Sequence, residues 1–327
     1  MLTDLPFTGF DTIQFGTIRS EDVRFSPSGK RLAVVATDGI LLVFTLKPSE
    51  HPLRITGHVE IHSNSFYSPH GVDFISEDTV AVANRGAALS FFRIPPPRSW
   101  PGPHKIKPVH EMTAPWIGET GSMRSEGERT VMCGLGAVRV QGHHVFVTCN
   151  KEGTLSKHPF SKLLKWIRTG NGQVISRELL SIPDSVAISR DRRWVAVGEH
   201  ESQCLVVHEA DGTRIRSTHK SPKLSHPHGI CFDPSGKMLF VADAGKKDIH
   251  IFRTDDDWKT SMEESTYRIE GIPEDLLQQT KDSVPEEFRP LEGGVKGLDL
   301  DPSGRIMATT CKHQLLRFFY LQPGESI

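Results

Sequence analysis

The sequence has few cysteines, and none of them is paired by its spacing. Its 327 residues include 5 cysteines and no Cys-x-x-Cys pair. An odd count without paired spacing argues against a disulfide framework and against a thiolate zinc site. We therefore expect a protein of a reducing, cytoplasmic environment.

The sequence also lacks an excess of either charge and any long apolar run. Lys and Arg total 39 against 40 for Asp and Glu, which gives a formal net charge of -1. That balance predicts no basic surface for a phosphate backbone. No apolar run approaches the roughly 18 residues that span a membrane, and the N-terminus lacks the cationic end and apolar stretch of a signal peptide. We expect neither a nucleic-acid nor a membrane partner, and no nucleotide cofactor is indicated.

What the sequence does contain is an internal repeat. Residues 23–34, 230–241 and 298–309 nearly coincide, and each joins two short apolar segments through a Pro-Ser-Gly turn. In such a turn proline presets its own φ and glycine supplies a position with φ > 0, so each copy predicts a β-hairpin. Weaker copies follow the same pattern at residues 72–83, 138–148 and 186–198.

A third apolar segment follows every hairpin, and a looser fourth segment precedes the next copy. The third segments are residues 41–46, 89–94, 154–160, 204–208, 249–253 and 315–321. Four strands in about 54 residues per unit, repeated six times, predict an all-β fold, a six-bladed β-propeller of four-stranded antiparallel blades. The rival fold, a pair of β-sandwiches, would need a different topology for equivalent segments.

We predict a single propeller domain over residues 1–327. Its blades are expected at residues 19–68, 69–134, 135–182, 183–226, 227–294 and 295–327. The sequence ends just after the third strand of the sixth copy, whereas residues 10–18 form a spare strand ahead of the first. Pairing this N-terminal strand with the last blade would close the ring and remove exposed sheet edges.

One copy carries a resemblance to a known superfamily. Residues 226–245, His-Pro-His-Gly-Ile-Cys-Phe-Asp-Pro-Ser-Gly-Lys-Met-Leu-Phe-Val-Ala-Asp-Ala-Gly, together with Asp248, resemble the repeat of lactonase-type propellers and of the NHL and gluconolactonase superfamily. Lactonase-type propellers usually have seven blades, whereas six is the number in the NHL and gluconolactonase group. The resemblance implies a propeller fold and a site at the mouth of the central channel.

The repeat also selects candidate site residues, because propellers place the start of each inner strand at one mouth of the channel. The six equivalent positions are Glu21, His70, Gly136, Asp184, His228 and Lys296. Five of them are ionisable. In a six-fold ring His70 faces His228 and Glu21 faces Asp184, so we predict that these side chains, with Lys296, form a catalytic centre.

Two imidazoles with one or two carboxylates form a ligand set for a divalent metal. His70, His228, Glu21 and Asp184 would suit zinc, iron or manganese better than calcium. In the gluconolactonase group the equivalent ring holds its cation mainly through carboxylate and amide oxygens, which Glu21 and Asp184 match in kind. The two histidines look more like the centres of NHL-type lyases. The same groups could also catalyse a reaction without metal, with Lys296 stabilising an anion. Alternatively, they could have no catalytic role and line a water-filled channel in which Lys296 neutralises Glu21.

Substrate contacts are predicted in a second ring and in two long loops. Asn84, Glu199 and Asp243 end the second strands of their blades, although an aspartate such as Asp243 commonly caps a turn. Residues 114–135 and 271–294 are long connections expected over the same mouth, where they could act as lids. Arg124 and Arg129 in the first loop could recognise an anionic group.

These features predict an enzyme that acts on a small polar or anionic molecule at the axial mouth. The expected chemistry is metal-assisted hydrolysis of the lactonase kind or lyase chemistry. Two alternatives stay open: a non-catalytic propeller that binds a protein or ligand on this face, and metal-free acid/base catalysis such as epimerisation or cyclisation.

Overall fold

The strong copies of the repeat fold into tight antiparallel hairpins. Asp233 accepts a hydrogen bond from the backbone N–H of Met238 across its turn, and Asp301 accepts one from Ile306, both at 2.8 Å. Glycine provides the left-handed residue of each turn, at a φ of 70° in Gly29, 71° in Gly236 and 71° in Gly304. The copies of the sequence repeat therefore share the same turn geometry.

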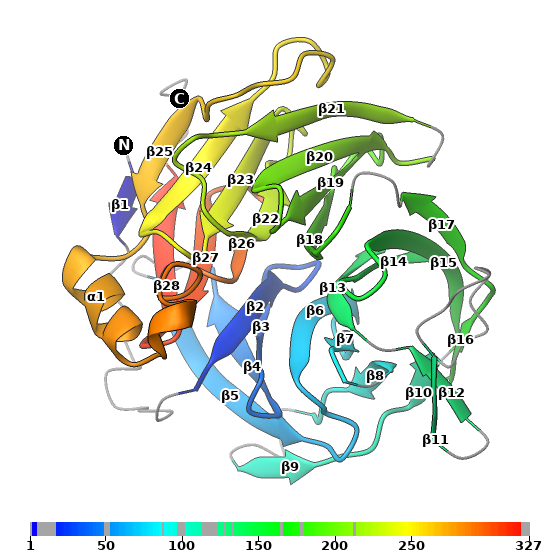
Figure 1. The fold of residues 1–327 in the computed structure, drawn as a ribbon. Helices are drawn as coiled ribbons and strands as arrows, with labels where there is room; N and C mark the ends of the chain where they lie inside the picture. The colour runs from blue at the N-terminus through cyan, green and yellow to red at the C-terminus, as the bar shows by residue number, and fades with distance from the viewer. Residues whose placement is uncertain are drawn as a thin grey trace.

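A computed structural model describes residues 2–4, 18–48, 53–86, 88–96, 102–112, 123–126, 129–132, 134–163, 166–176, 180–211 and 214–321. Six β-sheets surround a central axis in chain order, as the colour sequence of Figure 1 shows. This arrangement is the predicted six-bladed β-propeller.

The first three blades contain the strands of residues 20 to 176. The first blade contains β2 (Ser20–Phe25), β3 (Arg31–Ala36), β4 (Ile40–Lys47) and β5 (Arg54–His62). The second contains β6 (Pro69–Ser76), β7 (Thr79–Asn84), β8 (Leu89–Arg93) and β10 (His110–Met112). The third contains β13 (Leu135–Gln141), β14 (His144–Cys149), β15 (Thr154–Leu163), β16 (Trp166–Thr169) and β17 (Gln173–Ser176). Two blades exceed four strands, because β9 (Pro103–Lys105) adds to β5 in parallel and both β16 and β17 pair with β15.

The last three blades follow the predicted pattern. The fourth blade contains β18 (Pro183–Ile188), β19 (Trp194–Glu199), β20 (Cys204–Glu209) and β21 (Ile215–Lys220). The fifth contains β22 (Pro227–Phe232), β23 (Met238–Asp243), β24 (Asp248–Arg253) and β25 (Tyr267–Glu270). The sixth contains β26 (Leu298–Leu300), β27 (Ile306–Cys311) and β28 (Gln314–Leu321). Outside the blades lie the hairpin of β11 (Met123–Glu126) and β12 (Arg129–Met132), the helix α1 (Glu274–Asp282) and the short 3-10 turn η2 (Glu286–Phe288).

The strand that pairs with the edge of the sixth blade differs from the one expected. It is β1 (Leu2–Asp4), which runs antiparallel to β28 with Leu2 opposite Leu321. The expected strand was residues 10–18, of which positions 10–17 lie outside the described residues. The Leu2–Asp4 segment has only three residues and carries almost no strand signal of its own.

The core consists of apolar layers between neighbouring blades. At the seam between the last and first blades, Phe25, Val34 and Phe44 pack in one cluster with Ala308 and Phe318. The rings of Phe25 and Phe318 have centroids 6.5 Å apart. Because each sheet buries both faces against its neighbours, the middle strands are almost continuously apolar, as in β3 and β7.

Charged side chains occupy the channel below its mouth and link the inner strands. Asp22 on β2 accepts a hydrogen bond from the backbone N–H of Val72 on β6 at 3.1 Å, and Asp299 on β26 accepts one from Phe25 at 2.8 Å. Between them lies Arg24, whose guanidinium is 3.4 Å from Asp22 and 3.2 Å from Asp299. Carboxylates thus bridge adjacent blades, and Arg24 compensates their buried charge.

No helix in the part of the chain that the structure describes is both long and apolar enough to cross a bilayer.

Replacing Arg24 with methionine tests this channel network. The Arg24 side chain is 3% exposed, so R24M leaves two buried carboxylates without their shared cation and should lower the free energy of unfolding by about 3–5 kcal/mol. The matched control is R93M, which removes an exposed guanidinium paired with Asp78 and should cost less than about 1 kcal/mol. Equal urea midpoints for the two variants would contradict this account.

Asp73 on β6 should make stability depend on pH. Burial raises the pKa of Asp73 to about 7, although Arg24 opposes the rise. The unfolded carboxyl has a pKa of about 4, so the folded state binds this proton more tightly, and stability falls as the pH rises from about 4 to 7. Relative to D73N, the wild-type free energy of unfolding should decrease across that window and level off above it. Urea titrations at several pH values measure the difference, and a constant difference would refute the assignment.

Candidate active site

The five ionisable residues ahead of the inner hairpins converge at the mouth of the channel. Glu21, His70, Asp184 and His228 lie on the inner strands β2, β6, β18 and β22, and Lys296 lies two residues before β26. Their exposures are 0%, 2%, 2%, 5% and 4%. The repeat register therefore places a buried charged cluster where the six blades meet.

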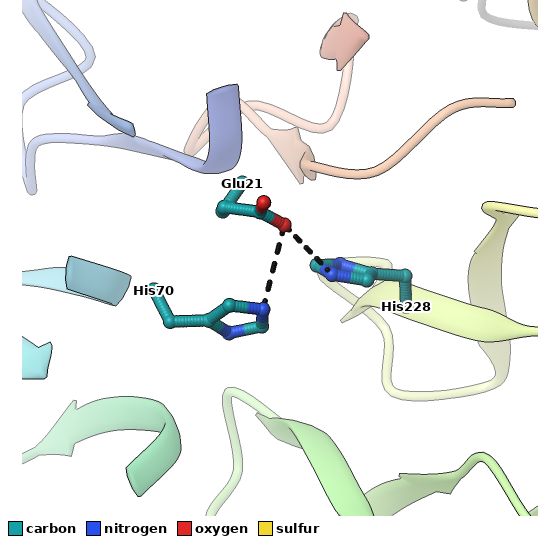
Figure 2. A group of neighbouring side chains, drawn as sticks. All are labelled: Glu21, His70 and His228. Atoms are coloured by element: carbon teal, nitrogen blue, oxygen red, sulfur yellow. Dashed lines mark ion pairs between the residues drawn. The ribbon is translucent and has the colours of Figure 1, made fainter. Parts of the chain in front are cut away.

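Within this cluster, imidazole nitrogens face carboxylate oxygens. The Nε2 atoms of His70 and His228 lie 3.4 and 3.2 Å from Oε2 of Glu21, which Figure 2 shows between the two rings. The same two nitrogens lie 3.4 and 3.5 Å from Oδ2 of Asp184. Neither Nε2 atom has a hydrogen-bond partner, although both are buried.

The backbone around Gly136 fixes the orientation of His70. The Nδ1 atom of His70 lies 2.6 Å from the carbonyl oxygen of Gly136 and donates to it. The Nε2 atom then faces the carboxylates of Glu21 and Asp184. Gly136 itself has no room for a side chain, since a Cβ there would lie 2.3 Å from Oδ1 of Asn150.

Each carboxylate of the cluster also has a cationic partner. The Nζ atom of Lys296 lies 2.9 Å from Oε2 of Glu21 and 3.0 Å from Glu292, and Nε of Arg19 lies 2.8 Å from Oε1 of Glu21. Across the mouth, the Arg85 guanidinium lies 2.7 Å from Oδ1 of Asp184. The three cations Lys296, Arg19 and Arg85 match the three carboxylates of Glu21, Asp184 and Glu292. If the imidazoles carry no charge, the net charge of the cluster is therefore close to zero.

The surroundings set the protonation states. Burial opposes ionisation of Glu21, but Lys296 and the two imidazoles outweigh it and hold the pKa of Glu21 well below its usual value. Arg85 and the nearby imidazoles do the same for the pKa of Asp184 against its burial. Burial lowers the pKa of His228, although Glu21 and Asp184 oppose the shift. At neutral pH the site therefore combines ionised carboxylates with a neutral His228.

A cavity of about 400 Å³ opens onto this cluster. Asp184, His228 and Lys296 line it, whereas Glu21 and His70 are not among its lining residues and lie deeper. Its wall also contains residues that the sequence did not single out, namely Arg19, Arg85, Asn150, Lys151, His200 and His226. The cavity is thus a cationic pocket with an imidazole-rich floor.

The missed residues stand at regular positions in the repeat. Arg85, Asn150 and His200 each come one residue after the second strand of a blade, and Arg19 and His226 come two residues before the axial residue of their inner strand. The cavity-lining residues Arg85, Asn150 and His200 thus follow the predicted second-ring positions by one residue. Because successive side chains of a strand point to opposite sides, that one-residue difference separates pocket residues from turn residues.

The second-ring residues hold turns and do not line the cavity. Glu199 accepts hydrogen bonds from the backbone N–H groups of Ser181 and Ile182, and Asp243 accepts them from Ser225 and His226. Asn84 donates to the carbonyl oxygen of Ala88 at 2.8 Å. The hydrogen bonds of Asp243 are those of a turn cap, and none of the three side chains is among the residues that line the cavity.

The two long loops differ in what the structure describes. Residues 271–294 form α1 and η2 and place Glu292 in the cavity wall, against Arg19 and Lys296. Of the loop at 114–135, the backbone of β11 and β12 is described, and Gly134 lines the cavity. The side chains of Arg124 and Arg129 lie outside the described residues.

The donor set fits a divalent ion. Glu21, His70 and His228 each offer a ligand atom, and these atoms all lie within 4.8 Å of one another. Outside this group of three, Oδ2 of Asp184 also lies within 3.5 Å of both imidazole nitrogens. In metal sites the second nitrogen of a histidine ligand typically donates to a backbone carbonyl, as Nδ1 of His70 does here.

Comparison with known proteins supports a lactonase-type propeller. Residues 168–271, from β16 to the end of β25, match the family described as "Lactonase, 7-bladed beta-propeller". A solved structure from Bacteroides uniformis ATCC 8492, provisionally described as a 6-phosphogluconolactonase, resembles this chain with a TM-score of 0.58. The two are 14% identical, over 92% of this chain and 80% of that chain, which shows a shared fold. A search among curated proteins finds no match. The present propeller has six blades instead of the seven that the family description gives.

The coupling between Lys296 and Glu21 can be measured directly. K296M should destabilise the fold by about 3 kcal/mol or more, because it leaves the buried Glu21 carboxylate with Arg19 alone. The double variant E21Q/K296M should be more stable than the sum of the single changes predicts, with a coupling of about 1–3 kcal/mol. Urea unfolding of the four proteins gives this value. The control K247M removes a partly exposed partner of Glu270 and should change stability very little. Additive effects of E21Q and K296M would contradict the pairing.

Proposed function

We propose that this protein is a hydrolase that opens a lactone, a cyclic ester, in the cavity at the axial mouth, assisted by a divalent ion. His70, His228, Glu21 and Asp184 would hold the ion. The observation that carries the proposal is the pair of buried Nε2 atoms that face two carboxylate oxygens at 3.2–3.5 Å without a hydrogen bond.

These distances suit ligands that share an ion. Two atoms that are each about 2.1 Å from a tetrahedral zinc ion lie about 3.4 Å from each other. Without a cation between them, the buried Nε2 atoms would stay unpaired beside the carboxylates of Glu21 and Asp184. Zinc, iron and manganese accept such mixed nitrogen and oxygen ligands, whereas calcium prefers oxygen alone.

The charges of the cavity favour an anionic substrate. The carboxylates of Glu21, Asp184 and Glu292 are already matched by Lys296, Arg19 and Arg85. A divalent ion would make the cluster positive, and Lys151 adds a further cation to the wall. The name of the solved neighbour implies a phosphorylated lactone, and a substrate of that charge suits this cavity.

In the proposed reaction, water adds to the acyl carbon, the bond from that carbon to the ring oxygen breaks, and the ring oxygen takes up a proton to give a hydroxy acid. A bound divalent ion supplies Lewis-acid polarisation of the lactone carbonyl. Lys296, held by Glu21 and Glu292, places an ammonium group beside the charge that develops on the substrate. Arg85 and Arg19, about two-fifths exposed at the rim, would orient the anionic end of the substrate.

A second candidate, metal-free acid/base catalysis, is favoured by the pairing of each carboxylate with a cation. Since Glu21 and Asp184 are neutralised by Lys296 and Arg85, they do not require an ion for charge balance. In this version neutral His228 would accept the proton from water or from a carbon of the substrate, and Lys296 would stabilise the anion. Epimerisation and cyclisation are further reactions of this kind.

Metal analysis and lactone hydrolysis test the two candidates together. Wild-type protein, purified without chelator or affinity tag, should contain zinc, iron or manganese and should acidify a solution of sugar lactones or phosphorylated sugar lactones in a pH-stat. D184N and H228A should lose the metal and reduce kcat/KM by about 10²-fold or more. The control H143A alters an exposed residue in the β13–β14 turn and should behave as wild type.

Chelation separates the outcomes. Loss of activity with a chelator and its return with added metal supports the metal-assisted reaction. Activity that ignores chelator, in protein without bound metal, replaces it with the metal-free candidate. Absence of hydrolysis across the lactone panel by metal-loaded protein overturns the proposed function.

A further inference from the structure

A third buried imidazole points at the same carboxylate as His70 and His228. His200 follows directly after β19 and is 7% exposed. Its Nε2 atom lies 3.4 Å from Oδ2 of Asp184 and has no hydrogen-bond partner. His200 therefore repeats the relation to Asp184 that the two axial histidines have.

Three Nε2 atoms thus surround one oxygen atom. Those of His70, His200 and His228 lie 3.4, 3.4 and 3.5 Å from Oδ2 of Asp184, and all three are buried without a hydrogen bond. A single imidazole near a carboxylate ordinarily turns to donate a proton to it at about 2.8 Å. Two ligands of one tetrahedral ion lie about 3.4 Å from each other, and each of these three nitrogens lies at that distance from Oδ2 of Asp184.

The neighbours of His200 fix its ring. The ring of His226 stacks on it with centroids 3.6 Å apart, and the ring of His228 lies 5.8 Å away. The Nε2 atom of His200 stays buried beside Asp184 without a hydrogen-bond partner. His226 makes no ion pair with a carboxylate within the described part of the chain.

We propose that His200 is a third imidazole ligand of the metal centre, through Nε2. The inference rests on the proposed function in so far as it requires the ion held by His70, His228, Glu21 and Asp184. The ligand set then contains three imidazole nitrogens and two carboxylates, drawn from four blades. Such a set selects zinc, iron, manganese or cobalt and excludes calcium and magnesium as the resident ion.

His200 and His226 offer a matched pair of variants. H200F and H226F each keep an aromatic ring in the stack and remove its nitrogens. By calorimetric titration of metal-free protein with zinc and with cobalt(II), H200F should bind at least about tenfold more weakly than wild type, since even residues behind the ligands contribute 10–100-fold. H226F should stay within about threefold of wild type. Calcium should bind none of the three proteins measurably.

The visible absorption of the cobalt(II) protein gives a second readout. H200F should change the cobalt bands, because a nitrogen ligand is lost, whereas H226F should preserve them. H200Q serves if H200F does not fold, as judged by circular dichroism and the thermal midpoint.

The outcomes separate this inference from the proposed function. If wild type binds no zinc or cobalt, the metal-assisted function fails and the inference fails with it. If wild type binds zinc and H200F binds it equally well with unchanged cobalt bands, only the role of His200 is refuted. Equal weakening in H200F and H226F also refutes it, because the effect would then belong to the stacked pair.

Discussion

The structure depends on burying ionised groups at the point where six blades meet. Glu21 and Asp184 are buried, yet Lys296, Arg85 and the imidazoles around them hold the pKa of both well below the usual value. A buried carboxylate is tolerated only with such partners. Because the partners come from different blades, the charge cluster exists only in the closed ring.

The same constraint continues down the channel. Asp22 and Asp299 accept backbone N–H groups of neighbouring inner strands, and Arg24 lies between their side chains. Apolar layers pack the blades against one another farther from the axis, while these polar contacts set how the inner strands are staggered. The mouth and the channel differ in chemistry: the mouth combines carboxylates with imidazoles beside a cavity, and the channel combines carboxylates with guanidinium groups.

The repeat register was enough to identify the axial residues, because one position per blade determines what points at the axis. Glu21, His70, Asp184, His228 and Lys296 could be found in this way, and the structure brings them together. Arg85 and His200 could not, since a choice one residue earlier selected Asn84 and Glu199, which hold turns. Arg19 and His226 stand at a periodic position too, but only the cavity shows that this position has room for a ligand.

The sequence by itself determined the blades, their number and the axial register, since these follow from local turn chemistry and strand alternation that recur along the chain. The tertiary structure alone decided the closing strand, because the pairing of Leu2–Asp4 with β28 joins distant segments and leaves little local signal. Only the tertiary structure shows which imidazoles lie against Asp184 and which cation pairs with each carboxylate. These relations are distances of 3–4 Å between residues from different blades, and such distances are set by ring closure and packing, not by any pattern within one segment.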